Sequence, residues 1–239
     1  MAALELLRPG TVWQLLSPIN GYSHWQGSSL ATQLWPGRAL QVLHSPSDCP
    51  RLRVRTRDDG YPCWLDPCDL LGAAMASAAT GTRLLSAATI GARLPRVLAY
   101  AQAALLQPNT YLWGGSLGPD FDCSGLVQRA FAEAGIWIPR DAYLQERFCQ
   151  PVAVRPGVLH ALLPGDLIFF GSPQRCTHVG LHLGQGRYLH SSGEEHGRNG
   201  LGVDDLNPHN RDAVATHYRL QLRGAGRVMR CHDGSPLPA

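Results

Sequence analysis

Apolar and polar residues alternate in short runs over residues 4–71, as expected for strands that bury one face. The runs are Thr11–Leu16, Ala39–Leu43, Arg51–Thr56 and Cys63–Leu65. Gly, Pro, Asn and Asp separate them at positions typical of turns. The pattern predicts a small β-barrel, which we assign to residues 1–75.

Helical spacing replaces this alternation further along the chain. Residues 76–92 are rich in small side chains and form a predicted linker, and Leu94–Gln107 follows with apolar residues at helical intervals. Another helix is predicted to begin at Cys123. Apolar residues recur after it with helical spacing as far as Ala134, and Gly135 then provides a stop signal.

A group of strands is predicted in the second half of the chain. They lie at Asp166–Phe170, Thr177–Gly184, Arg187–Ser192, His217–Leu222 and Gly226–Cys231, with a loop and a strand over Arg198–Asp205. The tight turn after Thr177–Gly184 places His178 and His190 on adjacent antiparallel strands, close enough for one imidazole to orient the other. His182 shares a strand face with His178, so alternation alone does not choose between them. The helices and strands together predict an α+β domain over residues 93–232, followed by a disordered tail at 233–239.

Composition limits the classes of partner. The 239 residues carry a formal net charge of +3 and are 44% hydrophobic, which is ample for a core. The basic residues are all Arg and form no basic run, so we expect no nucleic-acid partner. The seven cysteines do not suggest a disulfide scaffold. Cys63, Cys68, Cys49 and His44 make a poor zinc site, and we expect neither metal nor cofactor.

The N-terminal stretch gives an expectation about location. Glu5 and Arg8 interrupt its apolar residues, so it lacks the basic and apolar regions of a signal peptide. The sequence also has no apolar run long enough to span a membrane. We therefore expect a cytoplasmic monomer with no membrane partner.

Cys123 is the residue with the strongest chemical signal. A thiol near its ordinary pKa of ~8.5 is a weak nucleophile at neutral pH, and a helix N-terminus beside an imidazole is the usual way to stabilise the thiolate. The sequence supplies both, because Cys123 opens a helix and histidines follow on a hairpin. A buried core cysteine with solvated histidines is the alternative.

Residues 111–191 resemble the NlpC/P60 cysteine peptidases, papain-like enzymes that cleave bacterial cell-wall peptides. The resemblance rests on Tyr111-Leu-Trp-Gly-Gly, Asp122-Cys-Ser-Gly, Pro139-Arg-Asp-Ala, Pro164-Gly-Asp-Leu-Ile-Phe-Phe, His178-Val-Gly and Tyr188-Leu-His190, in the family's order. It implies that Cys123 is the nucleophile, His178 the general base and His190 the polar group that orients it.

The N-terminal part also resembles a known module. Asp58–Leu70 looks like the closing signature of a bacterial SH3-like domain, although such modules often have Gly at the position of Cys63. The predicted architecture is thus a small SH3-like β-barrel followed by a papain-like NlpC/P60 domain, in which the catalytic helix packs on an antiparallel sheet.

This combination resembles the γ-D-glutamyl-L-diamino-acid endopeptidases of muropeptide recycling. Trp113–Pro119 and Trp137–Gln145 resemble the cyanobacterial members. The resemblance implies a small murein peptide as substrate, cleaved between L-Ala-γ-D-Glu and a diamino acid such as meso-diaminopimelate, with a free N-terminal L-Ala. It implies that Asp122, Tyr61 and Tyr111 hold the ammonium group of that L-Ala, and that Ser124 lies on the substrate side.

Some roles stay open on sequence grounds. Asp122 also suits the N-cap of the Cys123 helix, and the two roles can coexist. Arg140 offers a planar donor fork for the α-carboxylate of γ-D-Glu, or a salt bridge to Asp141 or Asp122. Ala142 stands where some relatives carry Ser, which leaves the preferred diamino acid open.

Two other classes of function compete with the endopeptidase. An amidase or acyltransferase forms the same thioester, and only the acceptor differs. A non-catalytic wall-peptide-binding protein has no reason to preserve Cys123, His178 and His190 together. Release of L-Ala-D-Glu from a defined muropeptide separates the three classes.

Overall fold

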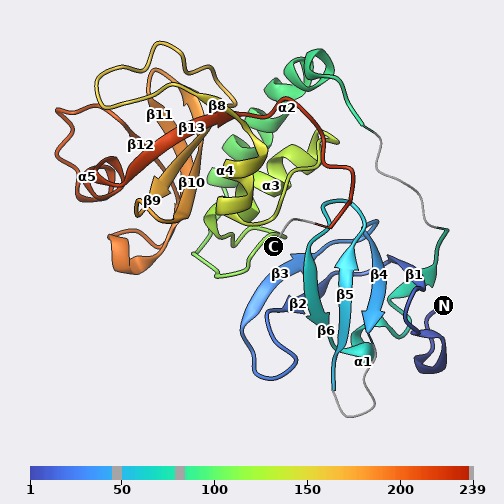
Figure 1. The fold of residues 1–239 in the computed structure, drawn as a ribbon. Coiled ribbons are helices and arrows are strands. Elements are labelled where there is room, and N and C mark those ends of the chain that lie inside the picture. Colours follow the sequence, from blue (N-terminus) through green and yellow to red (C-terminus); the bar gives the residue numbers. More distant parts are fainter. Residues whose placement is uncertain (45–49, 79–83, 237–239) are drawn as a thin grey trace. The chain divides into compact units, whose positions relative to one another are not determined.

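The computed structural model describes residues 1–44, 50–78 and 84–236 of the chain. They form two compact units (Figure 1). The first, which we call the N-terminal unit, comprises residues 1–84 with 113–117 and the segment from His232. The second, the Cys123 unit, comprises 85–112 and 118–231.

The N-terminal unit is built on an antiparallel seven-stranded sheet in the order β3-β2-β6-β5-β4-β1-β7. Its strands are β1 (Val12–Leu15), β2 (Ile19–Tyr22), β3 (Leu30–Leu34), β4 (Ala39–His44), β5 (Leu52–Thr56), β6 (Pro62–Leu65) and β7 (Ala74–Ala76), with the short helices η1 (Leu4–Leu6) and α1 (Pro67–Leu70). Alternate residues of β5 are buried, as the sequence pattern predicts: Leu52, Val54 and Thr56 face the core.

Two segments that are distant in sequence complete this unit. The Ser116 hydroxyl donates to the Gln33 carbonyl at 2.9 Å, and the Gln33 amide donates back to that hydroxyl at 3.0 Å. At the C-terminal end, the Ser235 carbonyl occupies the space that a Cβ on Gly60 would need. Residues 233–236, which the sequence assigns to a disordered tail, are therefore packed against the N-terminal unit, while 237–239 lie outside the described residues.

The Cys123 unit holds an antiparallel six-stranded sheet in the order β12-β11-β10-β9-β13-β8. The strands are β8 (Gln150–Val152), β9 (Leu167–Gly171), β10 (Cys176–Gly184), β11 (Arg187–Ser192), β12 (Gly200–Asp205) and β13 (Leu222–Arg227). The helices are α2 (Ala87–Leu105), α3 (Cys123–Glu133), α4 (Ala142–Phe148) and α5 (Ala213–Leu220), with a short 3-10 turn η2 (Glu194–His196).

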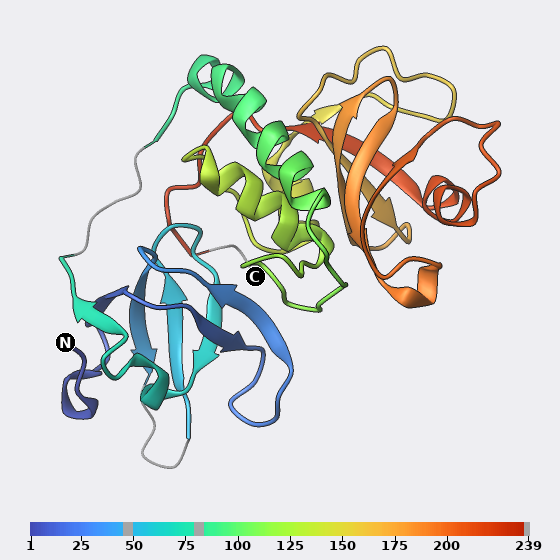
Figure 2. The same cartoon turned by 180° about the vertical axis from the view of Figure 1, so that it is seen from behind.

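Both faces of this sheet are covered. Leu167 and Phe169 of β9 belong to the apolar core that includes α2 and α3, which run side by side in Figures 1 and 2. Ile168 and Phe170 point to the other face and join a second core with Tyr218 of α5. The predicted α+β fold, with a helix opening at Cys123 on an antiparallel sheet, is confirmed.

The strand predicted at His217–Leu222 is wrong. Residues Ala213–Leu220 form α5, and β13 begins only at Leu222. Asp212 starts the helix because its carboxylate accepts hydrogen bonds from the amides of Val214 and Ala215, at 2.9 and 3.1 Å. The buried residues Val214, Ala215 and Tyr218 have helical spacing, which the alternation further along the segment concealed.

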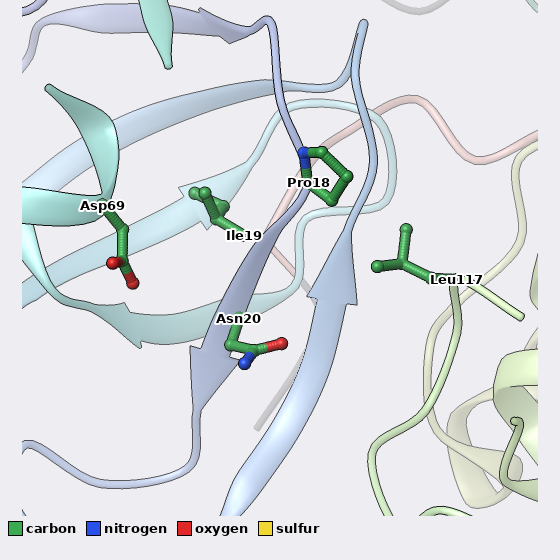
Figure 3. Close-up of a pocket in the computed structure, with 5 residues that line it drawn as sticks. All are labelled: Pro18, Ile19, Asn20, Asp69 and Leu117. Carbon is green, nitrogen blue, oxygen red and sulfur yellow. The ribbon is translucent and has the colours of Figure 1, made fainter. Parts of the chain in front are cut away.

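The N-terminal unit contains a pocket of about 240 Å³, shown in Figure 3. Pro18, Ile19 and Asn20 line it from the start of β2, Asp69 from α1, and Leu117 from the 113–117 segment. Burial, with the charge of neighbouring Asp66, raises the pKa of Asp69. None of the site residues predicted from the sequence lies in this pocket.

Gly60→Ala tests the contact between the C-terminal segment and the N-terminal unit. Gly60 has φ +70°, so any side chain there costs roughly 1–2 kcal/mol from the left-handed backbone alone. Its Cβ also collides with the Ser235 carbonyl. Gly37→Ala is the matched control, because Gly37 has φ +90° and open space around its Cβ position. We expect a larger fall in Tm for Gly60→Ala, and equal falls would contradict the contact.

Candidate active site

Cys123 is the first residue of α3, and Asp122 is its N-cap. The Asp122 carboxylate accepts a 2.6 Å hydrogen bond from the Gly125 amide, which satisfies one of the unpaired donors of the first turn. The Cys123 side chain is buried, and its sulfur lies close enough to β10 to accept a hydrogen bond from the Val179 amide. The helix start thus brings the thiol against the strand that carries His178.

The environment of Cys123 favours the neutral thiol over the thiolate that the sequence predicts. Burial, followed by the charge of Asp122, raises the pKa of Cys123 to about 12, although the Val179 amide, Arg140 and the Ser124 amide act in the opposite direction. Desolvation therefore outweighs the two amide hydrogen bonds and the charge of Arg140. The thiol needs a base at the moment of attack, because it does not carry a stored negative charge.

His178 and His190 meet as the predicted hairpin requires. They lie on the antiparallel neighbours β10 and β11, and Nε2 of His178 is 2.8 Å from Nδ1 of His190. His190 is fully buried and His178 nearly so. The contact occupies Nε2 of His178, which leaves Nδ1 as the ring nitrogen that can act as a base.

The ring of His178 is fixed by aromatic neighbours that sequence reasoning missed. Tyr218 of α5 stacks on it, with ring centroids 4.1 Å apart and an interplanar angle of 21°. The Tyr218 hydroxyl is itself held by Ser192 at 2.7 Å. Burial, together with the nearby imidazoles of His190, His196 and His217, holds the pKa of His178 well below 6.5. His178 is therefore neutral at pH 7.

The interactions of His190 continue to an acid that the sequence did not single out. Nε2 of His190 is 2.6 Å from Oδ2 of Asp204 on β12. Nη2 of Arg198 is 2.9 Å from both oxygens of that carboxylate. The predicted loop and strand over Arg198–Asp205 contains Asp204, but only the pairing of β11 with β12 shows that Asp204 lies on the strand face that carries His190.

His182 has a different environment from His178. Its Nδ1 is 2.9 Å from the Leu163 carbonyl, and its Nε2 accepts a hydrogen bond from the Gly186 amide at 3.1 Å. One ring nitrogen therefore holds the loop before β9, and the other holds the turn between β10 and β11. The structure thus distinguishes the two histidines that alternation left equivalent.

Arg140 forms one of the salt bridges left open by the sequence, the one to Asp122. Its guanidinium meets both carboxylate oxygens, at 3.1 and 2.6 Å, and donates to the Ser124 hydroxyl at 2.9 Å. The Arg140 side chain is 1% exposed and that of Asp122 is 11% exposed. Asp122 is therefore the more accessible member of the pair, and a contact of Arg140 with a substrate carboxylate stays a prediction.

Tyr111 lies near Cys123 in the same unit. Burial, with the charges of Cys123, Asp122 and Glu195, raises the pKa of Tyr111, so its hydroxyl stays protonated and able to donate. Tyr61 follows the β5–β6 turn of the N-terminal unit, where its amide donates to the Thr56 hydroxyl at 2.9 Å. The roles of Tyr111 and Tyr61 toward a substrate ammonium remain predictions.

The part of the chain that the structure describes contains no group of three or more His, Cys, Asp or Glu side chains that could hold a metal ion. Cys49, one member of the poor zinc site considered above, lies outside the described residues. Across residues 1–44, 50–78 and 84–236, no helix is long and apolar enough to cross a membrane.

Cys123→Ala and Cys123→Ser are expected to abolish turnover and leave Tm nearly unchanged. Cys176→Ser is the matched control, because Cys176 is also buried and its thiol donates a hydrogen bond to the His178 carbonyl at 3.4 Å. Peptide mapping after iodoacetamide treatment checks the assignment. Stoichiometric inactivation mapped to a residue other than Cys123 would show that the nucleophile is misassigned.

The pH dependence of kcat/KM and of Cys123 alkylation follows from the neutral resting states of His178 and Cys123. Because the pKa of His178 lies below 6.5, the base is already deprotonated at that pH, and we expect the acid limb of kcat/KM below 6.5. Because the pKa of Cys123 is raised to about 12, its alkylation rate should keep rising through alkaline pH without an early plateau. A plateau near neutral pH would instead reveal a preformed thiolate.

His182→Ala should lower stability but not turnover. Two hydrogen bonds of a buried side chain are lost, which costs on the order of 1–3 kcal/mol. We expect kcat/KM close to that of the unmodified protein at a temperature where the variant is folded, whereas His178→Ala loses activity. An equal loss of kcat in both variants would show that the β10 register assigns the base wrongly.

Comparisons with known proteins agree with this geometry. Residues 108–221 match the NlpC/P60 family, and residues 23–70 match the bacterial dipeptidyl-peptidase Sh3 domain. Over 96 residues the chain is 40% identical to a bifunctional muramidase/DL-endopeptidase, CwlT, from Bacillus subtilis, a match that covers 38% of this chain. It is 42% identical over 84 residues, 34% of this chain, to a gamma-D-glutamyl-L-lysine dipeptidyl-peptidase from the same organism.

These matches cover a part of each relative. The matched region spans 27% of the length of both Bacillus subtilis proteins. A crystal structure of an NlpC/P60 family protein from Bacillus cereus covers 92% of this chain and 64% of that protein, at 22% identity and a TM-score of 0.47. The two domain matches lead to one conclusion: the chain carries a domain at residues 108–221 that matches the NlpC/P60 family, together with an N-terminal bacterial SH3-like domain matched at residues 23–70.

Proposed function

We propose that the protein is a cysteine endopeptidase that cleaves the bond between γ-D-Glu and the diamino acid of cell-wall peptides with a free N-terminal L-Ala. The observation that carries the proposal is the position of Cys123 at the start of α3, against the strand whose His178 is hydrogen-bonded to His190 at 2.8 Å. A nucleophile, a base and an orienting group in this order are what acyl transfer requires.

The first step follows from the neutral resting pair. The Cys123 sulfur attacks the γ-carbonyl carbon of D-Glu while its proton passes to Nδ1 of His178. The developing oxyanion is favoured at the N-terminal end of α3, where backbone N–H groups point out of the first turn. His178 then returns the proton to the amine of the diamino acid, which leaves as a free amine and leaves a thioester on Cys123.

The second step releases the dipeptide. Water attacks the thioester carbonyl as Nδ1 of His178 takes one of its protons, and the Cys123 sulfur leaves and recovers that proton. L-Ala-γ-D-Glu departs with a free γ-carboxyl group. Stacking of Tyr218 on His178 keeps the ring in one orientation through both proton transfers.

The requirement for a free L-Ala amine has a physical basis in Asp122. An ammonium taken out of water needs a nearby carboxylate, and a short site with one acid rejects a longer peptide by bulk as well as charge. Asp122 is adjacent to Cys123 and held in place by Arg140. We propose that Asp122, Tyr111 and Tyr61 receive the ammonium and that Ser124 lies beside the substrate, with Arg140 acting chiefly to position Asp122.

The proposed setting is the recycling of murein peptides by a cytoplasmic monomer. The substrate is then a small fragment rather than the intact wall.

The direct test compares free and N-acetylated L-Ala-γ-D-Glu-meso-diaminopimelate. We expect release of L-Ala-D-Glu from the free tripeptide and a loss of most binding on acetylation, because acetylation deletes the charge and adds bulk. Equal kcat/KM for the two peptides would contradict the role of Asp122. Product analysis in the presence of an added amine separates hydrolysis from acyl transfer.

Asp122→Asn provides the residue-level version of this test. The amide can still cap α3 through its oxygen, so the helix start is preserved. We expect KM for the free tripeptide to rise and the discrimination against the acetylated one to shrink. Asp141→Asn is the matched control, because Asp141 is the N-cap of α4 and makes no side-chain capping bond there.

A further inference from the structure

The hydrogen bonds behind the catalytic base form a directed chain. Nε2 of His178 meets Nδ1 of His190 at 2.8 Å, and Nε2 of His190 meets Oδ2 of Asp204 at 2.6 Å. Arg198 closes the chain through Nη2, which is 2.9 Å from each Asp204 oxygen. All of these groups except Arg198 are buried, so water does not supply alternative partners readily.

Asp204, at the end of this series of hydrogen bonds, carries a fixed charge. Burial alone would raise the pKa of Asp204, but the hydrogen bond to His190 and the charges of His190 and Arg198 lower it below its ordinary value. Asp204 is therefore ionised at neutral pH, and an ionised carboxylate only accepts hydrogen bonds. Its partner, Nε2 of His190, must carry the hydrogen.

This assignment propagates to the base. With the hydrogen on Nε2, Nδ1 of neutral His190 is an acceptor, so Nε2 of His178 must be the donor. Neutral His178 then has its lone pair on Nδ1, the nitrogen that takes the proton from Cys123. We propose that Asp204, held by Arg198, is a positioning residue that sets the tautomers of both imidazoles and so keeps Nδ1 of His178 ready to act as a base. The inference rests on the proposed Cys123–His178 chemistry.

Arg198 has room for its role because residue 202 is glycine. Gly202 pairs with His190 across β11 and β12, on the same strand face as Asp204. A Cβ at this position would collide with the Arg198 guanidinium. Because Gly202 has no side chain, the Arg198 guanidinium can lie over strand β12 and reach Asp204.

The other charged or titratable groups around His190 do not compete for its nitrogens. His178 approaches from β10, Asp204 from β12 with Arg198, and the ring of Tyr218 from α5 at 4.9 Å between centroids. The Tyr188 ring on β11 lies 5.0 Å away. Burial raises the pKa of Tyr188 and Tyr218 alike, so both stay neutral over the pH range of the experiments.

Asp204→Asn is expected to reverse the donor and acceptor roles along the hydrogen bonds from residue 204 to His178. Arg198 supplies the donors, so the Asn oxygen turns to Arg198 and its amide group donates to Nε2 of His190. His190 then carries its hydrogen on Nδ1, and His178 must carry its own on Nδ1, where the thiol proton should go. We expect kcat to fall by a factor on the order of 10²–10⁴, as for a carboxylate that orients the base in a serine protease, with KM little changed.

Two-bond ¹H–¹⁵N spectra of the imidazoles measure the tautomers directly. In the unmodified protein we expect the hydrogen on Nε2 of both His178 and His190, and in Asp204→Asn on Nδ1 of both. Asp166→Asn is the matched control, because Asp166 is also buried and forms a 2.8 Å salt bridge with Arg227. Neither residue contacts the His178–His190 pair through the salt bridge. It should lower Tm similarly and leave the tautomers unchanged.

Arg198→Met tests the contribution of the Arg198–Asp204 pair separately. Asp204 remains, so we expect the Nε2 tautomers of both imidazoles to be retained, whereas the loss of the Arg198 charge, which helps to lower the pKa of His190, should let His190 protonate at a higher pH in the spectra. In the double variant Asp204→Asn/Arg198→Met, the Asn is free to present its oxygen to His190. We expect kcat above that of Asp204→Asn alone, a rescue that loss of structure cannot produce.

Asp204→Asn with unmodified tautomers and kcat/KM within about twofold would overturn the proposal. If Asp204→Asn does not fold, the spectra of the unmodified protein decide, and hydrogens on Nδ1 of His178 and His190 overturn the proposal. The spectra require no substrate. A protein that shows the Nε2 tautomers and their reversal but does not cleave the tripeptide therefore refutes the proposed substrate and leaves this inference standing.

Discussion

Desolvation of the proposed catalytic groups is the constraint on which the rest of the site depends. Cys123, His178 and His190 are all buried, and burial is the largest influence on the pKa of each. A charged pair at rest would have to overcome that penalty, so the groups stay neutral and only the direction of their hydrogen bonds distinguishes a working arrangement from an idle one. Direction is imposed from the ends of the network, where fixed charges lie.

Those fixed charges follow one rule across the described residues. Each buried carboxylate, namely Asp59, Asp122, Asp166 and Asp204, is paired with an arginine, namely Arg38, Arg140, Arg227 and Arg198. A chain without lysine can meet this need well, because the planar guanidinium binds both oxygens of a carboxylate and tolerates burial better than an ammonium. Arginine thus stabilises the Cys123 helix start through Asp122 and the histidine pair through Asp204.

How much of the site could be predicted from the sequence depends on how far apart along the chain the interacting residues lie. The helix at Cys123 and the meeting of His178 with His190 were predictable, because a helix start and a hairpin are local patterns. Asp204 and Tyr218 were missed because their proximity depends on the pairing of β11 with β12 and on α5, whose helical spacing the sequence did not reveal clearly. The neutral thiol was missed for a similar reason, since burial is a property of the whole fold.

The path of the chain has a consequence for how such a protein can be assembled in evolution. The backbone passes between its two units at 84–85, 112–113, 117–118 and 231–232. A gene fragment ending at residue 84 would encode Gln33 without its partner Ser116, and Gly60 without Ser235. A single crossover at residue 84 therefore leaves the N-terminal unit incomplete, because that unit depends on segments encoded on both sides of the boundary.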